Sequence, residues 1–411
     1  MPRKYVGGTL PDYYIVDSDS HVDESKCELW KRFPDELKPW APRKFVDPNW
    51  KDVAGAARSG GTQKNSTRHY DNIWILEHSK VFPNSDFRTG PFGKLATFST
   101  HDPDQWYNRE GERSPKERIK DLDAEGFDVT FIFCVLHQNL LNTIDNPEVA
   151  YWFARGWNDW VTEWTEGYRD RVRGTMILPL HDTKLALKEL HRAADLGLGG
   201  AYLPCQFKGE WLYKERFHPI LEECVRLGMP VSIHQQLHES VGMRRLDTEF
   251  LKHLFMGIDA PFSVCGFIAS GVLDKFPDLK VAWIEQGAGW LPYYLERLEE
   301  HYEIMPDGAP KLRKDEPKDY FGDQLFICFE PEEADFLPLL TKKVGESGII
   351  IGSDYSHFDC LSPWSVQKVL ERDDLTDGQK KKILSDNGIR FWNLDPKTHE
   401  RMQPREASRA S

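Results

Sequence analysis

Short apolar runs alternate with amphipathic segments along most of the chain after about residue 114. Seven runs are rich in β-branched and aromatic residues and have the length of strands: 128–135, 174–178, 200–203, 230–234, 280–285, 324–329 and 348–352. Residues with helical spacing separate them, for example 183–194 and 290–298. The run 14–17 near the N-terminus adds an eighth strand. Continuously apolar short strands must be covered on both faces, so eight strands alternating with helices predict an α/β fold of the (β/α)8 TIM-barrel type.

Two regions interrupt this alternation. Residues 25–113 are rich in Trp, Pro, Gly and charged side chains, and they separate the first predicted strand from the second. We therefore interpret 1–24 as the segment of the first strand and 25–113 as an insertion that covers the mouth of a distorted barrel. Residues 114–395 form the rest of that single domain. The polar residues 396–411 lack apolar periodicity and are predicted to form a loosely held C-terminal arm.

Polar side chains that could bind a metal or take part in catalysis follow five of the eight predicted strands. In (β/α)8 barrels the carboxyl ends of the strands point into the active-site mouth. The candidates at those ends are Asp19, His21 and Glu24 after the first strand, His234 and His238 after the fifth, Glu285 after the sixth, Glu330 after the seventh, and Asp354 and His357 after the eighth. Asp19 and His21 are two residues apart, so in extended backbone both can face one ion. Carboxylates that converge in a low-dielectric pocket repel each other unless a cation neutralises them, so the pattern predicts a metal site.

Composition argues against several classes of function. The chain has 411 residues, with 53 Lys and Arg against 66 Asp and Glu, and its net charge of −13 disfavours binding to nucleic acid. No apolar run approaches the length of a membrane helix, and no apolar stretch follows the N-terminal residues, so we expect neither a membrane protein nor a secreted one. The seven cysteines form no CxxC pair, which predicts free and mostly buried thiols in a reducing cytoplasm.

Longer motifs around the candidates resemble a known family. They are 19–24, His234, 271–280 leading into 285–292, 352–357 and 387–395. Together they are similar to the amidohydrolase-2 branch of the amidohydrolase superfamily, the branch of the aminocarboxymuconate-semialdehyde decarboxylase-like proteins. The resemblance covers nearly the whole chain apart from the insertion and the tail. It implies a metal-dependent barrel enzyme, and its motifs are specific to the family rather than to one reaction.

The resemblance also implies roles for individual residues. The family's first-strand ligand pair is usually His-x-His, and Asp19 and His21 stand there in this chain, as in the family's decarboxylases, in which a carboxylate takes the first place. His234 matches the strand-5 ligand. Asp354 matches the strand-8 aspartate that binds the metal or orients its water. Glu285 departs from the family pattern, because a histidine often serves as acid or base at that position.

A structural role is the alternative for several of these candidates. Asp19 is suited to cap a loop, and His234 to sit in a core beside a neighbouring carbonyl. Glu285 is suited to a structural salt bridge, and Glu24 to open the helix after the first strand. Glu330 is expected to hold a neighbouring side chain in place.

The remaining candidates are histidines and arginines. His238 and His357 are candidates for extra ligands, substrate anchors or partners of the ligands. The groups predicted to be catalytic are Asp354, Glu285, His238 and His357. By contrast, Arg118, Arg192 and Arg297 lie on predicted helices and are expected on solvated faces.

The predicted ligand set indicates which metal would bind. It consists of Asp19, His21, Glu24, His234, Glu285 and Asp354. Oxygen donors with some imidazole and no thiolate suit manganese or iron at least as well as zinc. One ion needs about four to six ligands, and a two-metal centre with ions roughly 3.5–4 Å apart and a bridging carboxylate is the alternative.

Three functions remain open from the sequence. The first is a metal-dependent hydrolase or carbon–carbon lyase, similar to a decarboxylase, that acts on a small carboxylate or aromatic acid. The second is a dinuclear non-haem iron or manganese monooxygenase that hydroxylates a small acid, since the carboxylate-rich set suits oxygen activation. The third is a non-catalytic partner subunit of a related enzyme. We expect a homodimer or a pairing with a homologous subunit.

Overall fold

The computed structural model contains two parallel sheets. It describes residues 4–24, 27–41, 43–46, 72–76, 80–83, 110–235, 251, 254–357, 360–395, 397 and 400–401. One sheet has the strand order β3 (Val16–His21), β7 (Val129–Phe133) and β8 (Val172–Gly174). The other has the order β16 (Ile349–Ile351), β15 (Leu325–Phe329), β14 (Val281–Ile284), β13 (Val231–His234), β10 (Ala201–Leu203) and β9 (Met176–Ile177). All neighbouring strands in both sheets are parallel, and each predicted run after residue 114 contains a strand.

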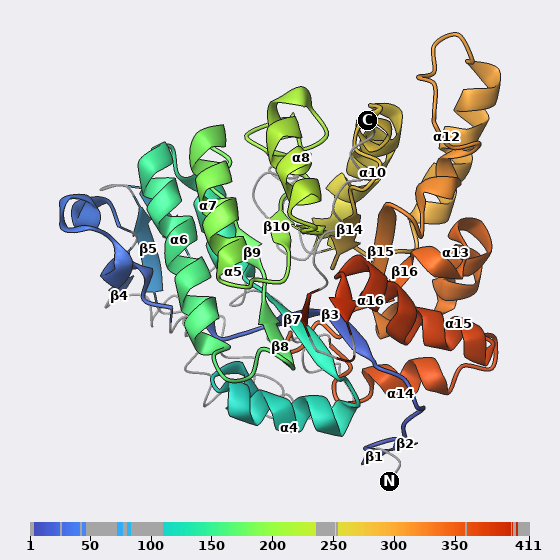
Figure 1. The fold of residues 1–411 in the computed structure, drawn as a ribbon, viewed down its shortest axis with the longest axis horizontal. Coiled ribbons are helices and arrows are strands. Elements are labelled where there is room, and N and C mark those ends of the chain that lie inside the picture. Colours follow the sequence, from blue (N-terminus) through green and yellow to red (C-terminus); the bar gives the residue numbers. More distant parts are fainter. Residues whose placement is uncertain are drawn as a thin grey trace, which may run out of the picture.

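Helices follow the strands and surround them (Figure 1). They are α4 (Pro115–Glu125), α5 (Val135–Thr143), α6 (Pro147–Trp164), α7 (Thr183–Asp195), α8 (His218–Arg226), α10 (Asp259–Ala269), α11 (Val272–Lys275), α12 (Leu291–Ile304), α13 (Leu337–Val344), α14 (Ser365–Leu370), α15 (Asp377–Lys381) and α16 (Asn387–Phe391). Local sequence fixes several ends. The Ser114 hydroxyl accepts a hydrogen bond from the main-chain N–H of Glu117 before α4, and the Asp182 carboxylate accepts one from that of Leu185 before α7. Gly126 ends α4 with a φ of 100°, a conformation that glycine adopts without strain.

Aromatic side chains fill the space between the strands. Trp392, just after α16, is fully buried, and its ring stacks on that of Phe131 with a centroid distance of 3.6 Å. Nearer the carboxyl ends of the strands, the rings of Phe133 and Tyr202 contact each other and the ring of His234. His234 therefore packs against an aromatic layer formed by these two rings.

The two parallel sheets contact each other at two places. Only Thr175 separates β8 from β9, and its main-chain N–H donates to a carbonyl of β7. At the other end, Ser20 of β3 forms a parallel bridge with Tyr355, which follows β16. The main-chain N–H of Asp354 also donates to the carbonyl oxygen of Asp19 at 3.1 Å. These bonds hold the end of β16 beside β3.

The described structure also contains smaller antiparallel elements. They are the hairpins β1 (Lys4–Tyr5) with β2 (Gly8–Thr9), β11 (Gln206–Phe207) with β12 (Glu210–Trp211) and β17 (Leu394–Asp395) with β18 (Glu400–Arg401), and a three-stranded sheet of β4 (Arg43–Val46), β5 (Asn72–Leu76) and β6 (Lys80–Pro83). The three-stranded sheet lies in the predicted insertion 25–113, where the pattern gave no strand, because short antiparallel strands carry little periodicity. Within the described residues, no helix is both long and apolar enough to cross a membrane.

The structure corrects two expectations. The first strand was predicted at 14–17, whereas β3 runs from Val16 to His21, because its polar residues continue the extended backbone and are all buried. Arg118 was expected on a solvated face, but its side chain is fully buried. Its guanidinium donates to the carbonyl oxygens of Gly111 and His21, and these bonds replace part of its hydration.

Candidate metal centre

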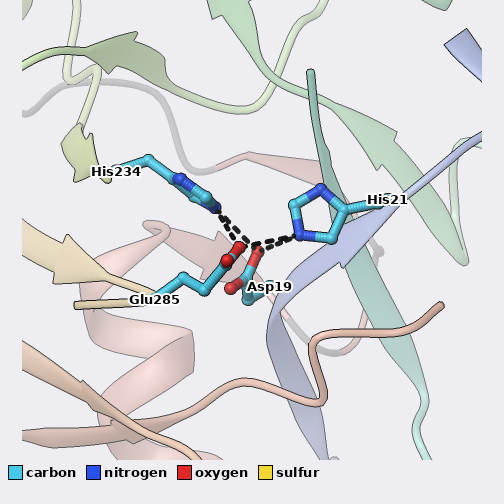
Figure 2. Close-up of side chains that lie close together, drawn as sticks. All are labelled: Asp19, His21, His234 and Glu285. Carbon is cyan, nitrogen blue, oxygen red and sulfur yellow. Dashed lines mark hydrogen bonds and ion pairs between the residues drawn. The ribbon is translucent and has the colours of Figure 1, made fainter. Parts of the chain in front are cut away.

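Four side chains converge at the carboxyl ends of the parallel strands (Figure 2). Asp19 and His21 lie on β3, His234 ends β13, and Glu285 directly follows β14. Asp19 and His21 leave the same face of their strand because they are two residues apart. One ligand atom from each of the four residues lies within 4.8 Å of those of the others.

The carboxylates of this group face the imidazole nitrogens. Oε2 of Glu285 lies 3.1 Å from Nε2 of His21 and 3.0 Å from Nε2 of His234. Oδ1 of Asp19 lies 3.5 Å from each of the same two nitrogens. The side chains of Asp19 and His234 are 0% exposed and that of Glu285 only 9%. Four potential ligands are thus withdrawn from water and directed at one another.

A main-chain contact fixes the tautomer of His21. Its Nδ1 lies 3.3 Å from the carbonyl oxygen of Phe133, the last residue of β7. A carbonyl oxygen only accepts hydrogen bonds, so Nδ1 carries the proton and donates it. In the neutral ring, Nε2 is then left with its lone pair toward Asp19 and Glu285, which is the arrangement of a metal-binding histidine.

Several buried polar atoms of the group make no ordinary hydrogen bond. Among the described residues, both carboxylate oxygens of Asp19 and both ring nitrogens of His234 are buried without a hydrogen-bond partner. A buried carboxylate without such partners is costly. A bound cation would remove that cost, so these atoms fit a metal site better than they fit a structural ion pair.

The charges of the group shift its pKa values in opposite directions. Burial lowers the pKa of His234, but the negative charges of Glu285 and Asp19 outweigh burial and raise it to about 10. Burial raises the pKa of Glu285, but the positive charges of His357 and His234 hold that pKa well below its usual range. Burial raises the pKa of Asp19. Without a cation between them, the carboxylates of this group thus favour protonated imidazoles.

Asp354 and His357 form a second group with His21 and Glu285. Both lie in the segment after β16. Oδ1 of Asp354 lies 2.9 Å from Nε2 of His21 and 2.6 Å from Nδ1 of His357. Nδ1 of His357 lies 3.6 Å from Oε1 of Glu285.

Two residues of the site have unusual backbone conformations. Glu285 has a φ of 50° and Asp354 a φ of 51°, in the left-handed region that residues with a side chain rarely adopt. Strain of this kind persists where the surrounding structure enforces it, and it clusters at functional sites. Gly287, two residues after Glu285, has a φ of 67°, which glycine adopts without strain.

The other predicted site residues lie elsewhere or are not described. Glu24 lies outside both groups, and its carboxylate instead accepts a hydrogen bond from the main-chain N–H of His137 at 2.8 Å and contacts Nδ1 of the same residue. Glu330 also lies outside both groups. His238 lies outside the described residues.

Two further contacts support the site without a sequence signal of their own. Nε2 of Gln235 donates a hydrogen bond to Oε1 of Glu285. In the sequence, only the position of Gln235 next to His234 suggests that it belongs to the site. The contact from Phe133 uses a main-chain carbonyl, which any residue type provides. Only the fold brings these groups to the ligands.

Comparison with known proteins places the chain in a family. The family model described as amidohydrolase matches residues 75–394. The chain belongs to this amidohydrolase family. As an amidohydrolase it is an enzyme by descent, and the resemblance deduced from its motifs is confirmed.

Curated relatives of this amidohydrolase carry decarboxylase names. A 2-amino-3-carboxymuconate-6-semialdehyde decarboxylase from Dictyostelium discoideum is 27% identical over 286 residues, which cover 69% of this chain and 77% of the relative. A gamma-resorcylate decarboxylase from a Polaromonas species is 23% identical over 296 residues, which cover 68% of this chain and 87% of the relative. These names favour the hydrolase or lyase interpretation and give no support to the oxygenase.

Solved structures share the fold of this amidohydrolase. An amidohydrolase from Mycobacterium avium subsp. paratuberculosis has a TM-score of 0.71 and 17% identity, over 94% of this chain and 99% of the other. A 5-carboxyvanillate decarboxylase from Novosphingobium aromaticivorans, complexed with manganese and 4-hydroxy-3-methoxy-5-nitrobenzoic acid, has a TM-score of 0.64 and 18% identity, over 96% of this chain and 100% of the other. At such identities these likenesses establish the fold alone.

Proposed function

We propose that this amidohydrolase is a metal-dependent decarboxylase of a small, unsaturated or aromatic carboxylic acid. The observation that carries the proposal is the buried group of Asp19, His21, His234 and Glu285, whose ligand atoms face one another. The choice of decarboxylation over hydrolysis rests on the named relatives, which are decarboxylases. Glu285 also stands where the family's hydrolytic pattern has a histidine.

The residues present fit a divalent ion such as manganese. Asp19 and Glu285 offer hard oxygen atoms, and His21 and His234 offer imidazole nitrogens, a combination that suits manganese, iron or zinc. When bound, the ion would neutralise the carboxylates and attract the carboxylate of the substrate. The Phe133 carbonyl holds His21 in the ligand tautomer, and the aromatic layer orients His234.

The proposed reaction needs a proton at the carbon that carries the carboxyl group. Protonation of that carbon turns the ring or conjugated system into a form from which the carbon–carbon bond breaks, and its electron pair returns to that system as carbon dioxide leaves. Asp354 is proposed to deliver the proton, because its carboxylate is buried beside the ligands, in contact with His21 and His357. Asp354 is only 3% exposed, so bulk water has little access to its carboxyl group.

A direct assay tests this function. Manganese-loaded protein is incubated with 2,6-dihydroxybenzoate, 5-carboxyvanillate and 2-amino-3-carboxymuconate 6-semialdehyde, and release of carbon dioxide is measured. We expect turnover of at least one of these acids, and loss of turnover in the folded Asp354→Asn variant. Hydrolysis of amides or esters without any decarboxylation would contradict the proposal.

We also propose that the two parallel sheets close into one distorted (β/α)8 barrel. The continuity of β8 with β9 through Thr175 supports closure on one side, and the bridge of Ser20 to Tyr355 supports it on the other. In this arrangement β8 and β9 count as one strand, so the strands number eight. The insertion 25–113 is proposed to cover the mouth of that barrel, and the domain boundaries stay predictions.

The partners and the compartment stay proposals as well. A small acid is the proposed substrate, in line with the acids that the relatives' names mention. A homodimer or a pairing with a homologous subunit, and a cytoplasmic location, are predictions that sedimentation and cell fractionation would test.

A further inference from the structure

Asp17 is a buried acid of β3 that belongs to neither group of candidate ligands, and it is 0% exposed. Its Oδ1 accepts hydrogen bonds from the main-chain N–H groups of Asp19 at 3.3 Å and of Ser353 at 2.8 Å. Its Oδ2 accepts them from the hydroxyls of Thr130 at 2.6 Å and of Ser353 at 2.8 Å. These bonds use the roughly four lone-pair sites of a carboxylate. Asp17 therefore fits its place without a cation, unlike Asp19, whose carboxylate oxygens have no hydrogen-bond partner among the described residues.

The bond from the N–H of Asp19 lies inside a bulge of β3. Between the opposed pairs Asp17–Thr130 and Ser20–Ile132, β3 has two residues where its neighbour β7 has one (Figure 1). A bulge of this kind re-aims a side chain, and bulges are common next to active sites. Asp19 is one of the two bulged residues, and its N–H is bonded to the Asp17 carboxylate. Asp17 therefore holds the backbone from which the Asp19 side chain reaches the candidate centre.

The other main-chain bond reaches the segment after β16. Ser353 donates to Asp17 from both its N–H and its hydroxyl, and the next residue is Asp354. The N–H of Asp354 in turn donates to the carbonyl oxygen of Asp19 at 3.1 Å. Asp354 has a φ of 51°, and a residue with a side chain keeps such a conformation only where the surrounding structure enforces it. The Asp17 carboxylate thus holds the backbone next to both aspartates of the site.

We propose that Asp17 is a positioning residue, whose hydrogen bonds set the directions of the Asp19 and Asp354 side chains. The proposal rests on the proposed function, in which Asp19 binds the ion and Asp354 delivers the proton. Asp17 acts by accepting hydrogen bonds, and neither its charge nor a contact with the ion is needed for this role. A displacement of about 1 Å at a reacting group can lower a rate about a hundredfold, so the directions of these two side chains matter for the reaction.

Two substitutions of Asp17 separate hydrogen bonding from shape and charge. Asp17→Asn keeps the shape, and its oxygen can accept both main-chain N–H groups while its amide group donates to the two hydroxyls. Those hydroxyls have other acceptors, because Thr130 Oγ1 lies 2.7 Å from Ser20 Oγ, and Ser353 Oγ lies 3.2 Å from the Asp19 carbonyl oxygen. Asp17→Leu has a similar shape but accepts no hydrogen bond. The asparagine variant should therefore keep the backbone in place, and the leucine variant should release it.

Manganese titration of the full, chelator-stripped chain tests the proposal. The dissociation constant should rise about 10- to 100-fold in Asp17→Leu and less than about threefold in Asp17→Asn. Near-ultraviolet circular dichroism checks that each variant is folded. Glu125→Met is the matched control. Glu125 is 1% exposed and also accepts bonds from a hydroxyl and a main-chain N–H, those of Ser362 and Ser365, but it ends α4 and lies outside both ligand groups. This variant should bind manganese as the unchanged protein does.

Two further readouts follow the backbone and the chemistry separately. In the ion-free protein, hydrogen exchange of the peptides that contain the N–H groups of Asp19 and Ser353 should be faster in Asp17→Leu and unchanged in Asp17→Asn. With saturating manganese and the acid that the carbon dioxide assay identifies, Asp17→Leu should lower kcat at least about tenfold and change KM less, because Asp354 is displaced. Glu125→Met should alter neither the exchange of these peptides nor kcat.

Each other outcome has a distinct meaning. Equal manganese affinity in the unchanged protein and in folded Asp17→Leu would overturn the role of Asp17 and leave the proposed centre intact. Equal losses in Asp17→Asn and Asp17→Leu would overturn this role too, because charge rather than hydrogen bonding would then matter. No manganese binding by the folded, unchanged protein would overturn the proposed centre and the role of Asp17 with it.

A second variant decides the matter if Asp17→Leu does not fold. Ser353→Ala removes the hydroxyl that bonds to the Asp17 carboxylate and to the Asp19 carbonyl oxygen. Manganese binding should weaken severalfold in this variant, and the peptide that contains residue 353 should exchange faster. An unchanged affinity and unchanged exchange in folded Ser353→Ala would overturn the role of Asp17.

Discussion

Arg118 donates a hydrogen bond from Nη2 to the main-chain carbonyl oxygen of His21. Its Nε donates to the carbonyl oxygen of Gly111 at 3.0 Å, and its guanidinium lies 3.8 Å above the ring of Tyr355. A fully buried cation on α4 thus joins β3 to the segment after β16. These two segments carry His21 and Asp354, so Arg118 fixes the backbone on which the candidate centre stands.

Replacement of Arg118 by Ala should destabilise the protein strongly. The change leaves a cavity and two carbonyl oxygens without their donors, so we expect the free energy of unfolding to fall by about 3 kcal/mol or more. Urea unfolding followed by fluorescence measures this loss. Arg297→Ala is the control, because Arg297 is 49% exposed and pairs with Glu300, and a change within about 0.5 kcal/mol is expected. Equal effects of the two substitutions would mean that Arg118 is not structurally important.

Much of the fold could be predicted because buried parallel strands leave a simple signal. The strand β15 is apolar throughout, and all its residues are buried. The same rule located His234 and Glu285, because residues that directly follow such strands lie at the mouth. The two-residue period of a strand also predicts that Asp19 and His21 face the same point.

Other features could not be predicted, because their partners are not specified by local sequence. The burial of Arg118 depends on main-chain carbonyls and on Tyr355, which is distant in the chain. Glu24 has the right residue type and position for a ligand, but the fold places it against His137. The stacking of His357 on His21 likewise depends on how the segment after β16 meets β3.

Removal of divalent metal should lower the stability of the folded protein. Manganese at 100 times its dissociation constant should add about 2.7 kcal/mol to the free energy of unfolding, since it binds only the folded site. Thermal unfolding with manganese and with a chelator measures the difference. In Asp19→Asn the manganese effect should shrink, because one ligand is lost.

The ion-free form of the same variant provides the second half of this test. Asp19→Asn removes one of the buried negative charges that face each other, so without metal it should be at least as stable as the unchanged protein. If manganese stabilised Asp19→Asn and the unchanged protein equally, Asp19 would not be a ligand.

Alkylation of Cys265 should depend steeply on pH. Burial raises the pKa of this thiol to about 11, and only the thiolate reacts. At pH 7.5 the folded protein should therefore react very slowly with iodoacetamide, and the rate at Cys265 should rise about tenfold per pH unit between pH 8 and 10. Intact mass and peptide mapping measure the adduct, and Cys265→Ser is the control. Rapid labelling of Cys265 at pH 7.5 would contradict the raised pKa.

Tyr202 and Tyr320 provide a matched pair of buried phenols. Both residues are fully buried. The hydroxyl of Tyr320 donates to Oδ1 of Asp274, whereas the hydroxyl of Tyr202 has no hydrogen-bond partner among the described residues. A buried hydroxyl without a partner costs free energy, and a bonded one contributes about 1 kcal/mol.

The two Tyr→Phe substitutions should therefore differ in sign. Tyr320→Phe should lower the free energy of unfolding by about 1 kcal/mol, because Asp274 loses its donor. Tyr202→Phe should leave the stability unchanged or raise it, since the removed hydroxyl has no protein partner to lose. Chemical unfolding of the two metal-loaded variants at one pH measures the difference. If Tyr202→Phe cost as much as Tyr320→Phe, the Tyr202 hydroxyl would be hydrogen bonded in solution, and the layer beneath His234 would be more polar than its side-chain contacts indicate.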